Sequence, residues 1–166
     1  MDAFELSTMI NRPIEEAFAV LANLESDVKW HSAFVETRNT SGGSLGVGAR
    51  FLVFEGLLGR RTGGIVYEVT EYEPNRIAAW KTVSGPLQLK FWRTFERVVG
   101  DTRFTIRYEA EVRGFFKLVM PLLARTVKRQ HEGDLRKVKE LMETRAPRPR
   151  SLSSCWAISL YRYDVH

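Results

Sequence analysis

The sequence has very little cysteine: Cys155 is the only one among 166 residues. A single cysteine excludes an internal disulfide bond and a cysteine-cluster metal site. The sequence also contains no apolar run long enough to span a bilayer and no signal-peptide pattern. We therefore expect a cytoplasmic protein without an integral membrane segment.

Motifs for covalent catalysis and phosphate binding are missing as well. No serine or cysteine lies in a nucleophile motif. The glycine-rich segment SGGSLGVG (41–48) lacks the P-loop lysine pattern and the strand-to-helix setting of a dinucleotide site, so we interpret it as a hairpin loop. The histidines His31, His131 and His166 show no metal-ligand spacing along the chain. The sequence therefore predicts neither a metal ion nor another cofactor.

The excess of positive charge is modest: 25 Lys and Arg face 20 Asp and Glu, a formal net charge of +5. The cation-rich segments RTVKRQ (125–130) and LRKVKE (135–140) fall on the outer face of a predicted amphipathic helix, where a solvated surface is the simpler interpretation. No nucleic-acid partner is expected. The chain does contain 44% hydrophobic residues, enough for one domain with a real core, as a monomer or homodimer.

Apolar periodicity divides the chain into strands and helices. Residues 3–10 alternate like a first strand, residues 11–26 predict a helix, and a short helical piece ends near Trp30. Six strand-like stretches follow, near residues 32–40, 48–57, 63–73, 76–84, 87–99 and 102–113. From Phe115 a spacing of three and four predicts one long amphipathic helix, with an inner stripe of Met120, Leu123, Val127, His131, Leu135, Val138 and Met142. We predict a domain over residues 1–146 and a tail over 147–166 outside it.

The segment LKFWRTFERVVGDTRFTIRYEAEV (89–112) predicts a hairpin with an arginine on its inner face. With Gly100-Asp101 as a two-residue turn, Arg93 lies opposite Tyr108. The other face carries opposite charges across the strands, such as Lys90 with Glu111, which suits a wet surface. Arg93 is therefore expected inside, in a row of apolar side chains.

The same arithmetic extends the inner face over two further strands. The pairs that a Pro74-Asn75 turn predicts are Glu71–Ala78, Val69–Trp80 and Tyr67–Thr82. The next connection places Ala78 beside Arg93. Glu71 and Arg93 are then expected to meet over the small alanine.

Two interpretations of Arg93 are open. It forms an internal network with Glu71 and Tyr108 or reaches past the cavity rim to water; alternatively, Arg93 and Tyr108 donate hydrogen bonds to an oxygen of a bound ligand. His131 is either an acid or base facing the cavity or a hydrogen-bonded helix histidine. His31 either guards the mouth of the pocket or is a solvated loop residue.

The element order and several segments resemble one known family. INRPIEEAFAVLANLES, GVGARF, YEVTEYEPNRIAAW, FERVVGDTRFTIRYEAEVRG and LRKVKELMET, within residues 3–145, are similar to the polyketide cyclase/dehydrase-type branch of the START-like helix-grip superfamily. The resemblance implies an α+β fold: a seven-stranded curved antiparallel sheet wrapped around the long C-terminal helix, with two short helices after the first strand. It also implies a cavity between helix and sheet that holds an apolar or aromatic molecule.

The pattern and the resemblance together predict a binding function. The predicted ligand-binding residues are Tyr67, Val69, Glu71, Trp80, Phe91, Arg93, Phe95, Ile106, Tyr108, Val127 and His131. The favoured hypothesis is a module that binds a lipid- or polyketide-like molecule. The alternative is a cyclase- or dehydratase-type enzyme, in which Arg93, Tyr108 and His131 are the catalytic candidates and polarise a substrate carbonyl. A protein-interaction module, which would expose an apolar patch, is the third hypothesis.

Overall fold

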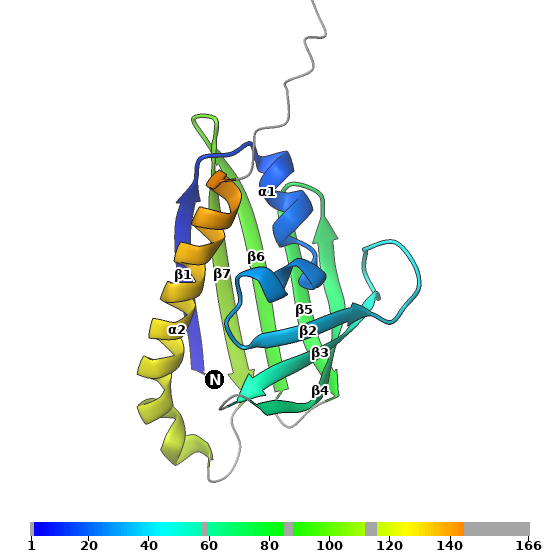
Figure 1. Ribbon diagram of the computed structural model, residues 1–166, viewed down its shortest axis with the longest axis vertical. Helices are drawn as coiled ribbons and strands as arrows, with labels where there is room; N and C mark the ends of the chain where they lie inside the picture. Colours follow the sequence, from blue (N-terminus) through cyan, green and yellow to red (C-terminus); the bar gives the residue numbers. More distant parts are fainter. Residues whose placement is uncertain (1, 58–59, 85–87, 112–115, 145–166) are drawn as a thin grey trace, which may run out of the picture.

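The computed structural model describes residues 2–57, 60–84, 88–111 and 116–144 (Figure 1). Its elements are β1 (Asp2–Ile10), α1 (Ile14–Leu21), the 3₁₀ helix η1 (Leu24–Lys29), β2 (Phe34–Asn39), β3 (Arg50–Leu57), β4 (Arg60–Glu73), β5 (Ile77–Ser84), β6 (Gln88–Val98), β7 (Asp101–Glu111) and α2 (Phe116–Thr144). The strands form one antiparallel sheet in the order β1-β7-β6-β5-β4-β3-β2. The predicted fold class is confirmed, including the two short helices after the first strand. The predicted tail, 147–166, lies outside the described residues.

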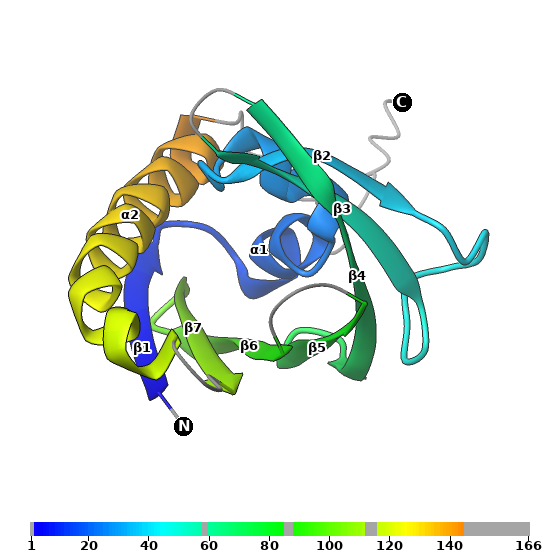
Figure 2. The same cartoon turned by 90° about the horizontal axis from the view of Figure 1, so that it is seen from below.

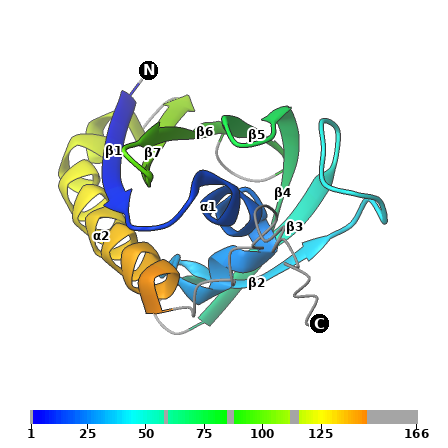
Figure 3. The ribbon, with the colours of Figure 1, turned by 90° about the horizontal axis from the view of Figure 1, so that it is seen from above.

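The sheet curls strongly, and the helices lie on its concave side. Views from both ends show α1 inside the curve and α2 alongside β1, near the gap between the two edges of the sheet (Figures 2 and 3). The loop before β2 is tied to α2, because Ser32 N donates a hydrogen bond to Asp134 Oδ1 at 3.1 Å. Helix α2 is thus attached on both sides of the gap. Within the described residues, no helix combines the length and apolar character needed to cross a membrane.

Both α-helices bury one apolar face. Helix α1 buries Ile14, Ala17, Phe18 and Leu21. In α2 the side chains of Leu135, Val138 and Met142 are buried in the same core. The predicted inner stripe is therefore confirmed for this half of the helix. Met120, Leu123 and Val127 belong to α2, but their side chains lie outside the described part of the structure.

The β6–β7 hairpin turns one residue earlier than its sequence predicts. Val99 and Gly100 form the loop, both with positive φ (49° and 94°), and Val98 pairs with Asp101. Positive φ at both central positions is the geometry of a type I′ turn, whose second position suits glycine. Arg93 therefore lies opposite Ile106, and the predicted pairing with Tyr108 is wrong. Every predicted face survives, because the register changes by two residues and side chains alternate with period two.

The β4–β5 hairpin contains a bulge that the sequence-based register omitted. The predicted pairs Tyr67–Thr82 and Val69–Trp80 are confirmed, but the register shifts between Val69 and Glu71. Glu71 pairs with Ala79 and is exposed, whereas Tyr72 takes the place opposite Ala78. The prediction that Glu71 faces inward to meet Arg93 is therefore wrong. One extra residue in a bulge sends the next side chain to the other face.

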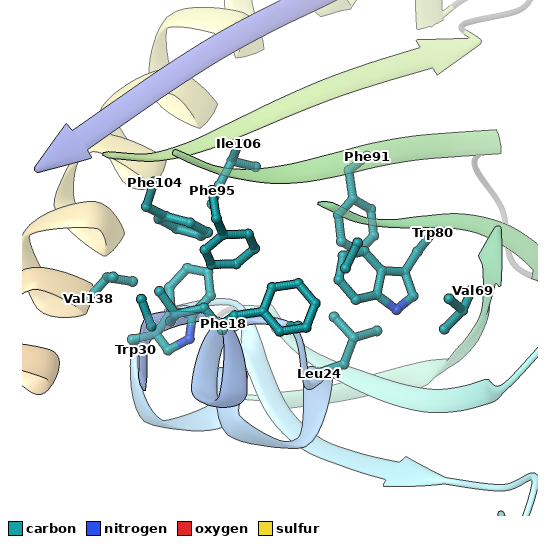
Figure 4. Packing of buried hydrophobic residues seen from close by; sticks show 14 of the residues in the cluster. Phe18, Leu24, Trp30, Val69, Trp80, Phe91, Phe95, Phe104, Ile106 and Val138 are labelled. Carbon is teal, nitrogen blue, oxygen red and sulfur yellow. The ribbon is translucent and has the colours of Figure 1, made fainter. Parts of the chain in front are cut away.

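Side chains of α1 and η1 fill part of the concave face. Phe95 contacts Phe18 of α1 with ring centroids 5.0 Å apart and Phe104 of β7 at 5.2 Å (Figure 4). Leu24 of η1 lies near Trp80 and Val69 in the same view. Phe95, Trp80 and Val69 thus belong to a packed core. The sequence-based register did not place α1 and η1 on the sheet. That these residues line one enclosed space together with Tyr108 and His131 stays a prediction.

Candidate functional site

Arg93 is buried inside the sheet as predicted, but its partner is Asp27 of η1. The side chains of Arg93 and Asp27 are 1% and 0% exposed. Arg93 Nη1 donates to Asp27 Oδ1 at 2.9 Å and to the carbonyl oxygen of Leu21 at 2.7 Å, while Nη2 donates to Asp27 Oδ2. The guanidinium group also lies 5.0 Å from the ring of Trp30 and 5.1 Å from that of Trp80. Arg93 is therefore held by a bidentate ion pair between aromatic rings.

The ion pair makes Arg93 a structural residue that joins η1 to the sheet. Burial raises the pKa of Asp27 to about 6, although the charge of Arg93 acts in the opposite direction. Both terminal nitrogens of the guanidinium group donate to Asp27 or Leu21, and the buried Nε alone has no hydrogen-bond partner among the described residues. Of the two interpretations of Arg93, the structure therefore supports the internal network, with Asp27 in place of Glu71 and Tyr108.

The cost of losing Arg93 should depend on pH. Arg93→Met removes the cation that lowers the pKa of Asp27, so this pKa should rise above 6. An acid whose pKa is raised by folding contributes stability below its unfolded pKa, and this contribution is lost as the pH rises through the folded pKa. In the wild type, stability stops falling not far above pH 6, because Asp27 is then ionised. In the variant the pKa of Asp27 is higher, so stability continues to fall as the pH rises further. Urea denaturation should show a larger difference between the two proteins at about pH 8 than at about pH 5.

A matched control is Arg97→Met, because the Arg97–Glu15 pair is exposed on both sides. Its effect on the free energy of unfolding should be small and nearly the same at both pH values. A pH-independent cost for Arg93→Met would show that Asp27 remains equally ionised with and without its partner.

A row of aromatic side chains crosses the rest of the inner face. Ring centroids lie 5.5 Å apart for Tyr67 and Phe91, 5.6 Å for Phe91 and Tyr108, and 4.6 Å for Tyr108 and His131. Phe4 of β1 stacks on Tyr108 at 5.0 Å. The structure thus brings together four of the predicted ligand-binding residues, from β4, β6, β7 and α2. We call Tyr67, Phe91, Tyr108 and His131 the aromatic row.

Polar atoms of the interior remain without protein partners. The buried Nε1 of Trp80 and Nδ1 of His131 have no hydrogen-bond partner among the described residues. Burial raises the pKa of the Tyr67 and Tyr108 phenols and lowers that of the His131 imidazole. At neutral pH both phenols are therefore uncharged hydrogen-bond donors. A wall of aromatic rings with a few such groups is typical of a small-molecule site.

His31 is buried beside the aromatic row, so it is not a solvated loop residue. Its ring stacks on Phe34 at 4.1 Å, contacts His131 at 5.3 Å, and its Nδ1 lies 3.9 Å from Asp134 Oδ2. Burial lowers the pKa of His31 well below 6.5. Sequence analysis missed Asp134 and Asp27 as interior acids. The available signal for Asp134 was its position three residues after His131, which places both on one helix face.

A small hollow of about 90 Å³ lies elsewhere, at the ends of β5, β6 and β7. Its lining includes Lys81, Lys90 and Glu109, whose side chains point away from the concave face by strand register. Thr82, Leu89 and Ala110, which lie on the concave face by register, also line it, so the hollow is at the end of the strands, and no residue of the aromatic row lines it.

Comparison with known proteins gives a family and a fold. The model of a family described as polyketide cyclase/dehydrase and lipid transport matches residues 1–143. No curated protein sequence matches the chain.

Three solved structures resemble the chain at low sequence identity. The di-domain ARO/CYC BexL from the BE-7585A biosynthetic pathway has a TM-score of 0.70 and 15% identity, over 86% of this chain and 47% of BexL. The chain thus spans about half the length of BexL. The Zhui aromatase/cyclase from Streptomyces sp. R1128 has a TM-score of 0.67 and 12% identity, over 86% and 93% of the two chains. Ara h 8.0201 has a TM-score of 0.63 and 14% identity, over 86% and 97%. At these identities the likeness shows a shared fold.

Proposed function

Because the chain belongs to the polyketide cyclase/dehydrase and lipid transport family, we propose that it binds an apolar or aromatic small molecule between the concave sheet and α2. The ligand is lipid-like or polyketide-like. It lies against the aromatic row, on the side of the interior away from the packed contacts of α1.

One observation carries this proposal: the aromatic row contains a buried nitrogen, Nδ1 of His131, that has no hydrogen-bond partner among the described residues. Stacked rings supply apolar area, Nδ1 of His131 offers one directional hydrogen bond, and the uncharged Tyr108 phenol stacked on it is a further hydrogen-bond donor. Buried polar groups are normally paired, so unpaired ones beside aromatic surface favour a bound molecule. The site is supported by four buried core residues, Phe95, Ile106, Val69 and Trp80.

A cyclase- or dehydratase-type enzyme is the second candidate, favoured by the stacking of Tyr108 on His131. An uncharged phenol beside a neutral imidazole can donate a proton or hydrogen bond to a substrate carbonyl and accept a proton nearby. Among proteins of similar fold, BexL is a di-domain ARO/CYC and Zhui is an aromatase/cyclase. Arg93 has no part in this version, because Asp27 holds its guanidinium group.

The hypothesis of a protein-interaction module gains no support. The exposed large apolar side chains among the described residues are Val28, Val35, Val47, Val83 and Val99. They come from five different segments and include no aromatic residue, the kind of apolar side chain that contributes most to binding at interfaces.

Binding of two probes tests the proposal. Oleic acid represents lipids, and 1,8-dihydroxyanthraquinone represents aromatic polyketides; tryptophan fluorescence should report binding, since Trp30 and Trp80 are buried in the interior. Tyr108→Phe should weaken binding of the preferred probe about threefold to tenfold, the value of one hydrogen bond. Tyr72→Phe is the matched control, because Tyr72 contacts Phe18 of α1 and not the aromatic row.

Native mass spectrometry of the freshly purified protein complements the titration. We expect a small molecule to co-purify or one probe molecule to bind per chain. The proposal fails if neither probe binds the folded protein and no small molecule co-purifies.

A further inference from the structure

Three side chains with metal-binding atoms converge beside the aromatic row. Each of His31, His131 and Asp134 offers one ligand atom, and these atoms lie within 4.8 Å of one another. None of the three is exposed: His31 and Asp134 are buried and His131 is half-buried. Two imidazoles and a carboxylate are a common donor set for divalent transition metals.

The fold brings the three residues together from distant parts of the chain. His131 and Asp134 lie three residues apart on α2, so they share one helix face. His31 follows η1, and its backbone N donates to the carbonyl oxygen of Asp27 at 2.7 Å. The Arg93–Asp27 ion pair anchors η1 to the sheet and thereby positions His31 opposite α2. We expected no metal ion because the histidines show no ligand spacing along the chain. Spacing along the chain does not reveal that the fold brings these three side chains together.

The unpaired nitrogen that favours a bound small molecule also suits a metal ion. Nδ1 of His131 is buried and has no hydrogen-bond partner among the described residues. A buried imidazole nitrogen without a partner is costly unless something binds it. The neighbouring Asp134 is oriented by two hydrogen bonds from Ser32, from its N at 3.1 Å and its Oγ at 3.2 Å. Such hydrogen bonds are typical of the groups that support metal ligands from behind.

We propose that His31, His131 and Asp134 bind one divalent transition-metal ion, of which Zn²⁺ is the first to test. In a tetrahedral zinc site the metal–ligand distances are about 2.0–2.2 Å, which puts the ligand atoms about 3.4 Å apart, so the three atoms, now within 4.8 Å of one another, need to close by at most about 1.4 Å. Three protein ligands leave a coordination position open.

The position of this site gives the metal ion a chemical role. His131 stacks on Tyr108, so the ion lies at the end of the aromatic row. An open coordination position there can take an oxygen of a bound molecule and polarise it as a Lewis acid, with the Tyr108 hydroxyl nearby. Metal binding itself does not depend on the proposed small-molecule function, whereas this role does.

Metal titration of the full-length protein tests the inference. Protein treated with a chelator and dialysed should bind one Zn²⁺ per chain by calorimetry, and Co²⁺ should give the visible absorption of a bound ion. His131→Phe keeps a ring against Tyr108 and Phe4 but removes both nitrogens. His131→Phe and His31→Phe should each weaken Zn²⁺ binding at least about tenfold.

Two variants serve as controls. Glu132→Gln removes an exposed carboxylate next to His131, and His166→Ala removes the remaining histidine of the chain. Both should bind Zn²⁺ like the wild type. Circular dichroism and melting temperature show whether each variant is folded, and a folded His131→Phe protein with unchanged Zn²⁺ affinity would overturn the inference. Absence of stoichiometric binding of Zn²⁺ and Co²⁺ to the wild type would also overturn it.

The two proposals can fail separately. The metal titration contains no apolar molecule, and the probe titration is run with chelator present. Loss of probe binding with intact Zn²⁺ binding would refute the proposed function alone, and the reverse result would refute the metal site alone.

Discussion

Removing either partner of the buried Arg93–Asp27 pair should lower the free energy of unfolding by about 3–5 kcal/mol at neutral to alkaline pH. Arg93→Met leaves a carboxylate, and Asp27→Leu leaves a guanidinium group, in a site where both side chains are almost fully buried. An unpaired buried charge loses its hydration without a compensating partner. Chemical denaturation of each single variant measures the effect.

The double variant Asp27→Leu with Arg93→Met distinguishes a stranded charge from lost packing. Replacing both partners by apolar side chains removes the uncompensated charge, so the double variant should be more stable than either single variant. Glu15→Leu with Arg97→Met is the control, because this pair lies at the surface and each change should cost less than about 1 kcal/mol. Additive losses in the buried pair would contradict the explanation.

Trp80→Ala should destabilise the fold by about 3–5 kcal/mol, the usual cost of removing a large buried aromatic side chain. Trp80 is 1% exposed, its ring stacks on Phe91 at 4.9 Å, and the Arg93 guanidinium lies 5.1 Å from it. The substitution therefore removes core packing, a stacked ring and one wall around the ion pair together. Urea denaturation followed by circular dichroism gives the change, since the substitution also alters the fluorescence signal.

Trp92 offers a matched control on the opposite face of the sheet. It is the next tryptophan after Trp80 in the chain. Its side chain is half-buried, and the Arg107 guanidinium group lies 5.6 Å from its ring. Trp92→Ala should cost clearly less than Trp80→Ala, because little core packing is lost. Equal costs for the two variants would mean that the concave face is not the main core.

The placement of side chains on the two faces of the sheet was predictable. Arg93, Phe91 and Phe95 are inside as expected, although the turn lies one residue earlier than predicted. Alternation in a strand is a local property, so a register change of two residues leaves each face intact. Glu71 shows the limit of this argument, because a bulge after Val69 changes the register by one residue and moves Glu71 outside.

The candidate site was only partly predictable. Tyr67, Phe91, Tyr108 and His131 form the aromatic row that their periodicity indicates, and His131 has the helix position expected of it. Their proposed role in ligand binding stays a prediction. Asp27 and Asp134 escaped notice because an acid in a short polar helix, or on a helix rich in charges, resembles a solvated residue until its neighbours are known.

By itself, the sequence determined the order of strands and helices and the faces of the sheet, because strand and helix periodicities are set by residues close together in the chain. The helix-grip fold followed from the resemblance of its segments to a known family. The tertiary structure decided which charges and rings meet. Arg93 pairs with Asp27, which lies 66 positions earlier in the chain. His31 lies beside His131 and Asp134, which belong to the C-terminal helix α2. Such contacts depend on how η1 and α2 pack against the curled sheet. The spacing of residues within one strand or helix carries no information about that packing. The partner of a buried charge is the opposite charge that the fold places next to it.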